Sequence, residues 1–558
     1  MGGSDRSSGG TAGPGLILPR RSLLALGAAG AMAATAARAQ GTPTPQAGRK
    51  GQIVVGLSQE PTVFNPLMPA IEVDQGVWWS VYSPLWGVDP KGMLFPQLAS
   101  EVPNEANGGI SRDGLRWKVK LRPDVKWHDG KPFSADDVKF TLDLINNPNF
   151  RAGSRDGHNL LQNVRVVSPT EIAWELSKPY APYPSILAWT FIVPKHIVEA
   201  AKDPNNSQLN TKPVGTGAFA WQDRVAGDHI TLAANPHFFG DGPHVERVVF
   251  KYIPDLTVMY TQFRTGDIDY TDLQGITPDH YAEAKTLKDR TVIVAPQAFM
   301  ESITLNLGKP VFAEPVVREA LYLAMQKQPI IDSIYYGLPQ ATESYLPRQS
   351  WAFNADLPKH QYDPKQAMQK LDAAGWKAGP GGVRQKGGQK LAFLNSTTAG
   401  NHVREQAQQL LQQNWMQIGA QMTIHNMPAA VIWGDYYHLS QFDSVMVGED
   451  FLIGADPDPS LRLASTSIPA KGGAGQNSGQ YSNPAVDKLL AAADATFERA
   501  KRTADYHQVQ TYVRHDLPLL PIFQYAMAKG TKKGLVGLAP NVNSLSDCWN
   551  LNAWYWQS

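Results

Sequence analysis

The chain has 558 residues, well beyond one typical domain, so we expect two or three domains. Its 51 Lys and Arg residues nearly balance 50 Asp and Glu residues, which argues against a nucleic-acid-binding protein because such proteins need a basic excess. The single cysteine, Cys548, excludes an intramolecular disulfide and a Cys-rich metal site.

The N-terminal segment has the pattern of an export signal. Arg20 and Arg21 precede an apolar run, 23–37, and an Ala-Arg-Ala triplet follows as a small-x-small cleavage site. The run is about 15 residues long, too short for a membrane span. We therefore predict a signal peptide over 1–39, resembling a twin-arginine signal, with an ordinary Sec signal as the alternative. A flexible tether over 40–49 follows, and the mature protein is expected to be soluble.

The rest of the chain mixes predicted strands and helices. Short β-rich or alternating runs predict strands at Gln52–Ser58, Leu115–Arg122, Glu171–Ser177 and Glu246–Ile253. Apolar spacing predicts helices at Thr257–Asp269, Pro315–Asp332, Asp363–Trp376, within His402–His425 and at Asn483–Ala495. The first is stopped at Gly266, and Asp363 and Asn483 are expected to cap the helices that they begin. This mixture predicts an α/β chain of more than one lobe.

The stretch "WHDGKPFSADDV" (127–138) raises the question of a metal or catalytic site. His128 and Asp129 lead into an Asp-Gly turn. Ser134 is placed as a helix N-cap, and the two following Asp residues oppose the positive end of the helix dipole. A metal site would need a second ligand cluster, and the sequence offers none. The stretch is therefore interpreted as a turn and a capped helix.

Other motif matches are weak. "GTGAFA" (215–220) resembles a dinucleotide loop, but it leads into a strand-like run instead of a helix. "DPDPS" (456–460) begins like a calcium loop but lacks the required Gly and closing Glu. No HExxH, GxSxG or GxxxxGK[ST] pattern occurs. The sequence therefore predicts a protein that is not an enzyme and that holds no cofactor or metal, although catalytic groups can lie far apart along a chain.

Several stretches, in one order along the chain, carry a family resemblance: Asp113–Asp143, Pro213–Phe219, Asn235–Gly240, Phe263–Tyr270, Leu305–Lys327, Asp363–Trp376, Tyr481–Leu490 and Leu517–Phe523. The set resembles the large extracytoplasmic solute-binding proteins of ABC importers, the peptide/nickel group known as family 5. The resemblance covers nearly all of the mature chain.

The resemblance implies an α/β fold of the two-lobe periplasmic-binding-protein kind, type II-like and large, with an extra subdomain in the first lobe. The implied ranges are 50–85, 210–298 and 515–558 for the main part of the first lobe, 86–209 for the extra subdomain and 299–514 for the second lobe. Hinge strands are expected near Phe299 and Leu517. Closure over the ligand would couple binding to shape.

The resemblance also implies ligand contacts in the second lobe. The segment 448–461 matches the place where peptide-binding relatives pair a carboxylate with the ligand's α-amino group, and Asp456 is the best match. A buried ammonium needs such a partner. Asp456 could instead cap the next helix, and an expected aromatic is replaced by Ile453. Further candidate anchors are Asp458, Glu449 and Asp450.

Three more candidate ligand contacts follow from the resemblance. The loop 69–76 matches a cleft loop of the family and places Glu72 near the ligand, with an exposed loop acid as the alternative. Trp433 and Tyr436 stand where the family has an aromatic near the ligand. A tryptophan packed in the core is the alternative.

The function implied is the substrate-binding component of an ABC importer. It would capture a peptide-like solute in an interlobe cleft and deliver it to a permease in the cytoplasmic membrane. We expect a periplasmic monomer that does not bind nucleic acid. An oligosaccharide, an opine or a metal chelate stays open as the ligand. An exported hydrolase with a noncontiguous site is the alternative from another class.

Overall fold

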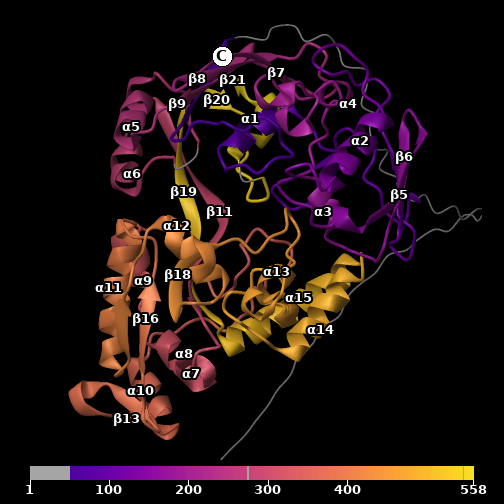
Figure 1. The fold of residues 1–558 in the computed structure, drawn as a ribbon. Helices are drawn as coiled ribbons and strands as arrows, with labels where there is room; N and C mark the ends of the chain where they lie inside the picture. The colour runs from indigo at the N-terminus through magenta and orange to yellow at the C-terminus, as the bar shows by residue number, and fades with distance from the viewer. Residues whose placement is uncertain (1–50, 273–274, 545, 558) are drawn as a thin grey trace, which may run out of the picture. The chain divides into compact units, whose positions relative to one another are not determined.

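The computed structural model describes residues 51–272, 275–544 and 546–557, and it shows a mixed α/β protein of two lobes (Figure 1). The predicted export signal and tether lie outside the described residues. The four predicted strands are confirmed as β1 (Gln52–Leu57), β4 (Arg116–Lys120), β6 (Glu171–Leu176) and β9 (Arg247–Tyr252). Strand β4 alternates exposed and buried residues, as its sequence pattern predicts.

One large sheet contains strands from both lobes. Its strand order is β17 (Gln421–Ile424), β16 (Ala392–Ser396), β18 (Ser444–Glu449), β11 (Arg290–Leu305), β19 (Leu519–Lys532), β10 (Tyr270–Thr271), β1, β9, β8 (His229–Ala234) and β7 (Phe219–Val225), with β12 (Gln340–Ala341) paired to β19. The pairs of β1 with β9 and β10 are parallel, as are those of β16 with β17 and β18. Smaller sheets are β4-β6-β5 (β5 Leu161–Ser168), β2-β3 (Trp86–Val88, Leu94–Pro96), β13-β14-β15 (Lys377–Ala378, Arg384–Lys386, Gln389–Lys390) and β20-β21 (Leu535–Val536, Tyr555–Trp556).

Strands β11 and β19 connect the lobes. They run antiparallel side by side from one lobe to the other (Figure 1), and their pairing extends from Arg290 with Lys532 to Thr304 with Leu519. The register shifts between Pro296 and Met300. A bulge of this kind bends the strands locally, and it falls beside the predicted hinge position.

The longer helices are α1 (Asp74–Val81), α2 (Ala135–Asn146), α5 (Leu256–Thr265), α8 (Pro315–Leu323), α10 (Pro364–Ala373), α11 (His402–Gln417), α14 (Pro484–Asp494) and α15 (Arg499–Asp516). Shorter ones are α3 (Tyr183–Leu187), α4 (Lys195–Val198), α6 (Pro278–Ala284), α7 (Pro310–Ala313), α9 (Lys327–Pro329), α12 (Ala429–Val431) and α13 (Ser460–Leu463). The predicted caps are confirmed: the side chains of Asp363 and Asn483 accept backbone N–H groups at the starts of α10 and α14, and Gly266 ends α5.

One predicted helix is wrong in extent. The run Pro315–Asp332 predicts a single helix, but α8 ends at Leu323, and a short α9 and a π-turn (Ile330–Ile334) follow. Pro329 explains the break, because a proline has no N–H to donate to the carbonyl of Met325 and its ring clashes with that carbonyl.

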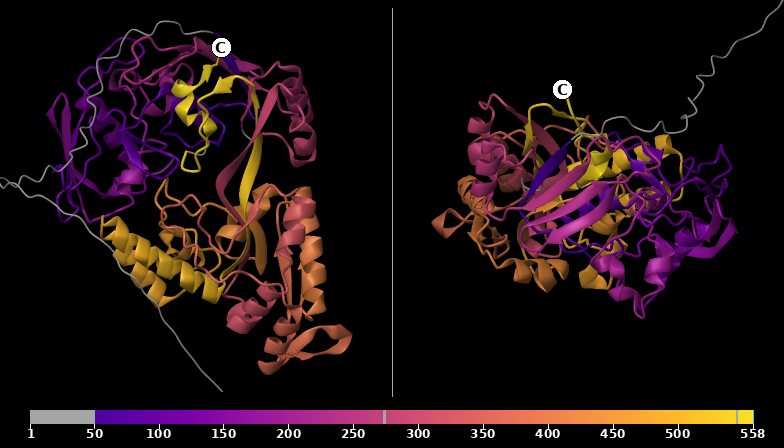
Figure 2. Two further views of the ribbon diagram at one scale, coloured as in Figure 1. Left: turned by 180° about the vertical axis from the view of Figure 1, so that it is seen from behind. Right: turned by 90° about the horizontal axis from the view of Figure 1, so that it is seen from above.

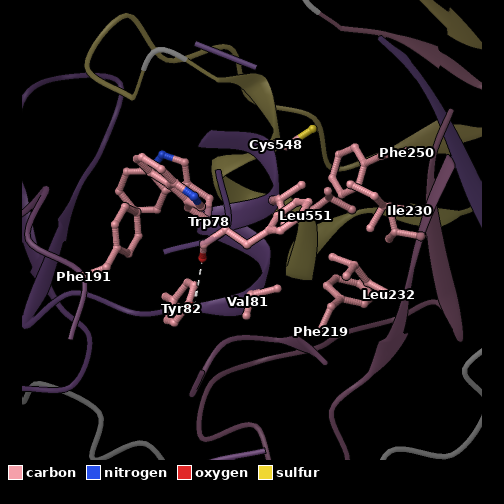
Figure 3. Close-up of a cluster of buried hydrophobic side chains, with 14 of the residues drawn as sticks. Trp78, Val81, Tyr82, Phe191, Phe219, Ile230, Leu232, Phe250, Cys548 and Leu551 are labelled. Carbon is pink, nitrogen blue, oxygen red and sulfur yellow. Dashed lines mark hydrogen bonds between the residues drawn. The ribbon is translucent and has the colours of Figure 1, made fainter. Parts of the chain in front are cut away.

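The main core of the first lobe combines residues from distant parts of the chain. Trp78, Val81 and Tyr82 at α1 pack with the sheet residues Phe219, Ile230, Leu232 and Phe250 (Figure 3). Cys548 and Leu551 from the C-terminal segment complete this cluster. The chain end is therefore built into the first lobe, and Cys548 is a free, buried thiol.

Separate cores define the other parts of the molecule. The extra subdomain is built around a core whose residues all lie between Leu85 and Ile192. The second lobe has its larger core between Ile303 and Phe523, with a smaller one around α14 and α15. Figure 2 shows the α14–α15 pair from two further directions. The exact residue ranges of the lobes given above stay predictions.

Among the described residues, no helix is both long enough and apolar enough to cross a membrane.

Candidate ligand-binding site

The stretch 127–138 has structural roles. Ser134 caps α2 in a capping box with Asp137, as predicted. His128 is held between two backbone groups: its Nδ1 accepts the Gly215 N–H at 3.2 Å, and its Nε2 lies 3.0 Å from the Gly217 carbonyl. Burial lowers the pKa of His128 to about 4. No group of His, Cys, Asp and Glu placed to hold a metal occurs within the described ranges.

The "GTGAFA" glycines serve close packing. A Cβ at Gly215 would lie 1.9 Å from the carbonyl oxygen of Val81, so only glycine fits against the end of α1. The segment then enters β7, which confirms the strand expected there.

Asp456 forms a buried ion pair. It lies between β18 and α13 and is 3% exposed. Arg502 of α15 binds it in a bidentate manner, with N–O distances of 2.7 and 2.6 Å. Arg502 also donates to the Tyr506 hydroxyl at 2.7 Å. Both carboxylate oxygens therefore already have a cationic partner, so a ligand ammonium would have to share Asp456 with Arg502.

Two further carboxylates lie beside this pair. Asp458 is buried and accepts the Ser460 backbone N–H at 2.9 Å. Asp494, the last residue of α14, has an Oδ1 atom that is buried without a hydrogen-bond partner among the described residues. Burial raises the pKa of both carboxyls, and so does the negative charge of Asp456. The three acids thus form one electrostatic group with Arg502.

Glu449 and Asp450 are joined by Arg462. Glu449 ends β18, is buried, and accepts from the Tyr437 hydroxyl at 2.8 Å as well as from Arg462. Arg462 also donates to the Asp450 carbonyl at 2.8 Å. The Asp450 carboxylate accepts the backbone N–H groups of Leu452, at 2.8 Å, and of Phe451, and burial raises its pKa to about 7. The negative charge of Asp450 is therefore less well balanced than that of Glu449, whose carboxylate pairs directly with Arg462.

Trp433 and Tyr436 lie in the π-turn Ile432–Tyr436, next to α12. Trp433 is 37% exposed and donates to the Thr398 hydroxyl at 2.9 Å. The Tyr436 hydroxyl lies 3.1 Å from that of Ser396. The Trp433 ring packs edge-on against Tyr437 at 5.4 Å. This face of the second lobe therefore presents an indole to solvent instead of burying it.

Glu72 lies on a loop that Asp74 holds in place. The buried Asp74 carboxylate accepts backbone N–H groups of Thr62, Val63 and Ile71 at 2.7 to 3.1 Å. The Glu72 carboxylate forms no hydrogen bond or ion pair with a described residue. It lines a cavity of about 20 Å³, space for roughly one water molecule.

The same cavity reaches the connecting strands. Its wall includes residues 296–298 of β11, where the register shifts, and Lys529 of β19. Lys529 is buried and pairs with Asp272 at 3.2 Å and Asp547 at 3.3 Å. One lysine thus faces three carboxylates, and of these only Glu72 makes no direct contact with a partner among the described residues. Burial raises the pKa of Glu72 to about 7.

A second buried ion pair stands on the connecting strands. Glu301 of β11 is 0% exposed, and Arg404 of α11 binds both of its oxygens at 2.9 Å. The hydroxyl of Tyr525 in β19 also donates to Glu301. This cluster ties both connecting strands to α11.

Sequence reasoning missed the basic partners of these acids. Arg502, Arg404 and Lys529 are separated from their partners by 46, 103 and 257 positions. A weak signal exists for Arg502, because a single arginine stands at the buried face of the amphipathic helix α15. The structure brings Asp456 and Asp458 together, joins Glu449 and Asp450 through Arg462, and sets Glu72 apart beside Lys529.

Comparison with known proteins agrees with this architecture. A family model described as "Bacterial extracellular solute-binding proteins, family 5 Middle" matches residues 94–471. The chain is 28% identical over 525 residues to the oligopeptide-binding protein AppA of Bacillus subtilis, covering 92% of each chain. The structure of that protein in complex with a nonapeptide matches with a TM-score of 0.72 and 26% identity, over 92% of this chain and 100% of the other.

A solved structure with a different ligand is equally similar. NikZ from Campylobacter jejuni, in complex with Ni(L-His), matches with a TM-score of 0.75 and 26% identity, over 90% of this chain and 99% of the other. The two-lobe fold therefore defines a solute-binding protein. The chain belongs to the bacterial extracellular solute-binding proteins of family 5, and the resemblance drawn from the sequence is confirmed.

Proposed function

We propose that this chain is the substrate-binding component of an ABC importer and captures a peptide-like solute between its lobes. The observation that carries the proposal is the likeness to an oligopeptide-binding protein over 92% of both chains, including a structure with a bound nonapeptide. Two lobes joined by β11 and β19 provide the hinge that such capture needs.

Charge and exposure favour particular contacts. In the first lobe, Glu72 has no direct partner within the described part of the chain and lines a cavity at the connecting strands. In the second lobe, the half-exposed Trp433 offers an apolar face and an edge for packing. Asp450 is the least compensated acid of the segment 448–461, whereas Asp456 already pairs with Arg502. We therefore assign Glu72 and Asp450 as the first candidates to meet a ligand cation, and Asp456, Asp458 and Glu449 as the second choice. Trp433, with Tyr436 next to it, is the candidate for an aromatic contact with the ligand.

The cellular setting follows from the family and the N-terminal pattern. We propose export by the twin-arginine route, a monomer in the periplasm, and delivery of the solute to a permease in the cytoplasmic membrane. The ranges 50–85, 210–298 and 515–558 would form the main part of the first lobe, 86–209 the extra subdomain and 299–514 the second lobe, except that Leu517, Leu520, Ile522 and Phe523 pack in the core of the second lobe.

A thermal-shift screen of residues 40–558 tests the proposal. The panel contains di- to nonapeptides, N-acetylated versions of the same peptides, oligosaccharides, opines and nickel–histidine. A ligand at 100 times its Kd stabilises the folded state by about 2.7 kcal/mol, enough to raise the Tm by a few degrees. We expect a rise with free-amine peptides that shrinks with the acetylated ones.

Other outcomes of the screen discriminate the alternatives. A rise only with nickel–histidine would favour the second candidate, a metal-chelate carrier, which the likeness to NikZ supports. A rise only with sugars or opines would keep the binding-protein function and reject the peptide. Turnover of a panel compound by pure protein, with no rise in Tm, would favour the hydrolase.

A further inference from the structure

The lobes touch at a second place, away from the connecting strands. The turn between α14 and α15, residues 494–499 of the second lobe, lies against the extra subdomain. The views in Figures 1 and 2 both place the end of this helix pair beside the violet part of the chain. We name this contact the latch, and its extra-subdomain side consists of Met93, Gly114, Trp117 and Ala181.

Phe497 forms the apolar centre of the latch. Its ring packs against the core of the extra subdomain and meets Trp117 edge-on at 5.9 Å between ring centroids. A Cβ at Gly114 would lie 2.5 Å from the Phe497 ring, so the ring rests directly on that glycine. A half-buried aromatic from one lobe thus completes the core of another part of the molecule.

Polar contacts flank Phe497 on both sides. The Ala181 backbone N–H donates to the Asp494 carbonyl at 2.9 Å. On the other side, the guanidinium of Arg499 reaches the Met93 sulfur at 2.8 Å and lies 4.7 Å from the Trp351 ring. The contacts of Ala181 with Asp494 and of Met93 with Arg499 join segments separated by more than three hundred positions, and they use no residue proposed above to meet the ligand.

These contacts exist only while the lobes are together, so they stabilise the closed form without any solute. From this geometry we infer that the latch biases the ligand-free protein toward closure and so sets the free energy that the ligand must supply. The inference rests on the proposed function, because it adds a regulating contact to the same hinge closure. A protein with a weaker latch would be more open and would bind its ligand more weakly.

The Asp494 carboxyl makes the latch sensitive to pH. The Asp494 carboxylate has a buried oxygen without a hydrogen-bond partner in the described chain. The titratable and charged groups that face it are Asp456, Asp458 and Arg502 from the second lobe and Lys178 and Tyr180 from the extra subdomain. Burial raises the pKa of Asp494, so closing is easier when this carboxyl is protonated. Closure should therefore weaken as the pH rises from 5 to 9.

Small-angle scattering of the ligand-free protein tests the latch. The variants are Phe497→Ser and a matched control, Tyr512→Ser, which removes a 37% exposed aromatic from the same helix α15. We expect a larger radius of gyration for Phe497→Ser than for wild type, and no change for Tyr512→Ser. A radius equal to that of wild type in Phe497→Ser would overturn the inference.

Two further variants keep the inference testable if Phe497→Ser does not fold and test the role of Asp494. Circular dichroism checks folding, and if Phe497→Ser does not fold, Met93→Ser opens the latch from the other side under the same criterion. In Asp494→Asn, the expansion between pH 5 and pH 9 should be smaller than in wild type, and an equal expansion would remove Asp494 from the latch.

A ligand measurement separates this inference from the proposed function. Phe497→Ser should raise the Kd for the solute found in the screen by about 3- to 10-fold, in line with one aromatic contact. If no peptide binds even to wild type, the peptide function fails, but the scattering comparison still decides the latch.

Discussion

At the scale of single residues, the buried pair of Asp456 and Arg502 decides how Asp456 can act. Breaking a buried ion pair by removing one partner typically costs about 3–5 kcal/mol, because the remaining charge stays buried. We therefore expect Asp456→Ala to lower the free energy of unfolding by about that amount, measured by urea denaturation. If Asp456 also anchors a ligand amine, the same change weakens binding by roughly 10- to 1,000-fold in calorimetry.

A double variant separates the two roles. Asp456→Leu with Arg502→Met removes both charges, and such replacements are often neutral for stability. Recovered stability with lost binding would identify Asp456 as an anchor. Recovered stability with unchanged affinity would leave it a structural residue.

The pKa of Glu72 gives a prediction with a defined pH window. Burial raises this pKa from 4.5 to about 7. A raised carboxyl pKa means that stability is full below pH 4.5 and is lost as the pH rises toward 7. We expect Glu72→Gln to have a higher Tm than wild type at pH 8 and an equal Tm at pH 4, measured by calorimetry.

The affinity for an amine-bearing ligand should change with pH in the opposite direction from the stability. A solute with a free amine should bind wild type more tightly as the pH rises from 5 to 8, because the Glu72 carboxyl ionises over that range. In Glu72→Gln this rise should disappear. A rise of equal size in the variant would show that another group titrates.

At the scale of elements, helix α2 depends on its first turn. Ser134 accepts the Asp136 N–H, and Asp137 accepts the Ser134 N–H in return. Replacing an N-cap serine by alanine costs about 1 kcal/mol. We expect Ser134→Ala to lower the urea midpoint accordingly, while Ser134→Asp should keep most of the stability. Equal stability of all three proteins would contradict the role of the cap.

Local sequence predicted the ends of some helices correctly and the extent of one helix wrongly. The caps at Asp363 and Asn483 and the stop at Gly266 were predictable, because each depends on residues within one helical turn. The prediction of one continuous helix over Pro315–Asp332 was wrong, because Pro329 interrupts the helix even though the apolar spacing continues past it. A proline inside a periodic run is the stronger signal.

At the scale of the whole molecule, closure can be measured directly. Adding a bound solute should reduce the radius of gyration of wild type, because a closed form contacts the ligand from both lobes. If the latch holds the free protein partly closed, the reduction should be larger in Phe497→Ser than in wild type. An unchanged radius in both proteins at saturation would argue against hinge closure.

The sequence by itself determined the family, the α/β character, the capped helices and the structural role of the stretch 127–138. These follow from local spacing and from motifs in order along the chain. Only the tertiary structure decided that Arg502 forms an ion pair with Asp456, that Glu72 lines a cavity with Lys529, and that Phe497 packs against Trp117. The physical reason is distance along the chain: the energy of a charge or a ring depends on neighbours that folding brings from far away, and no local pattern records them.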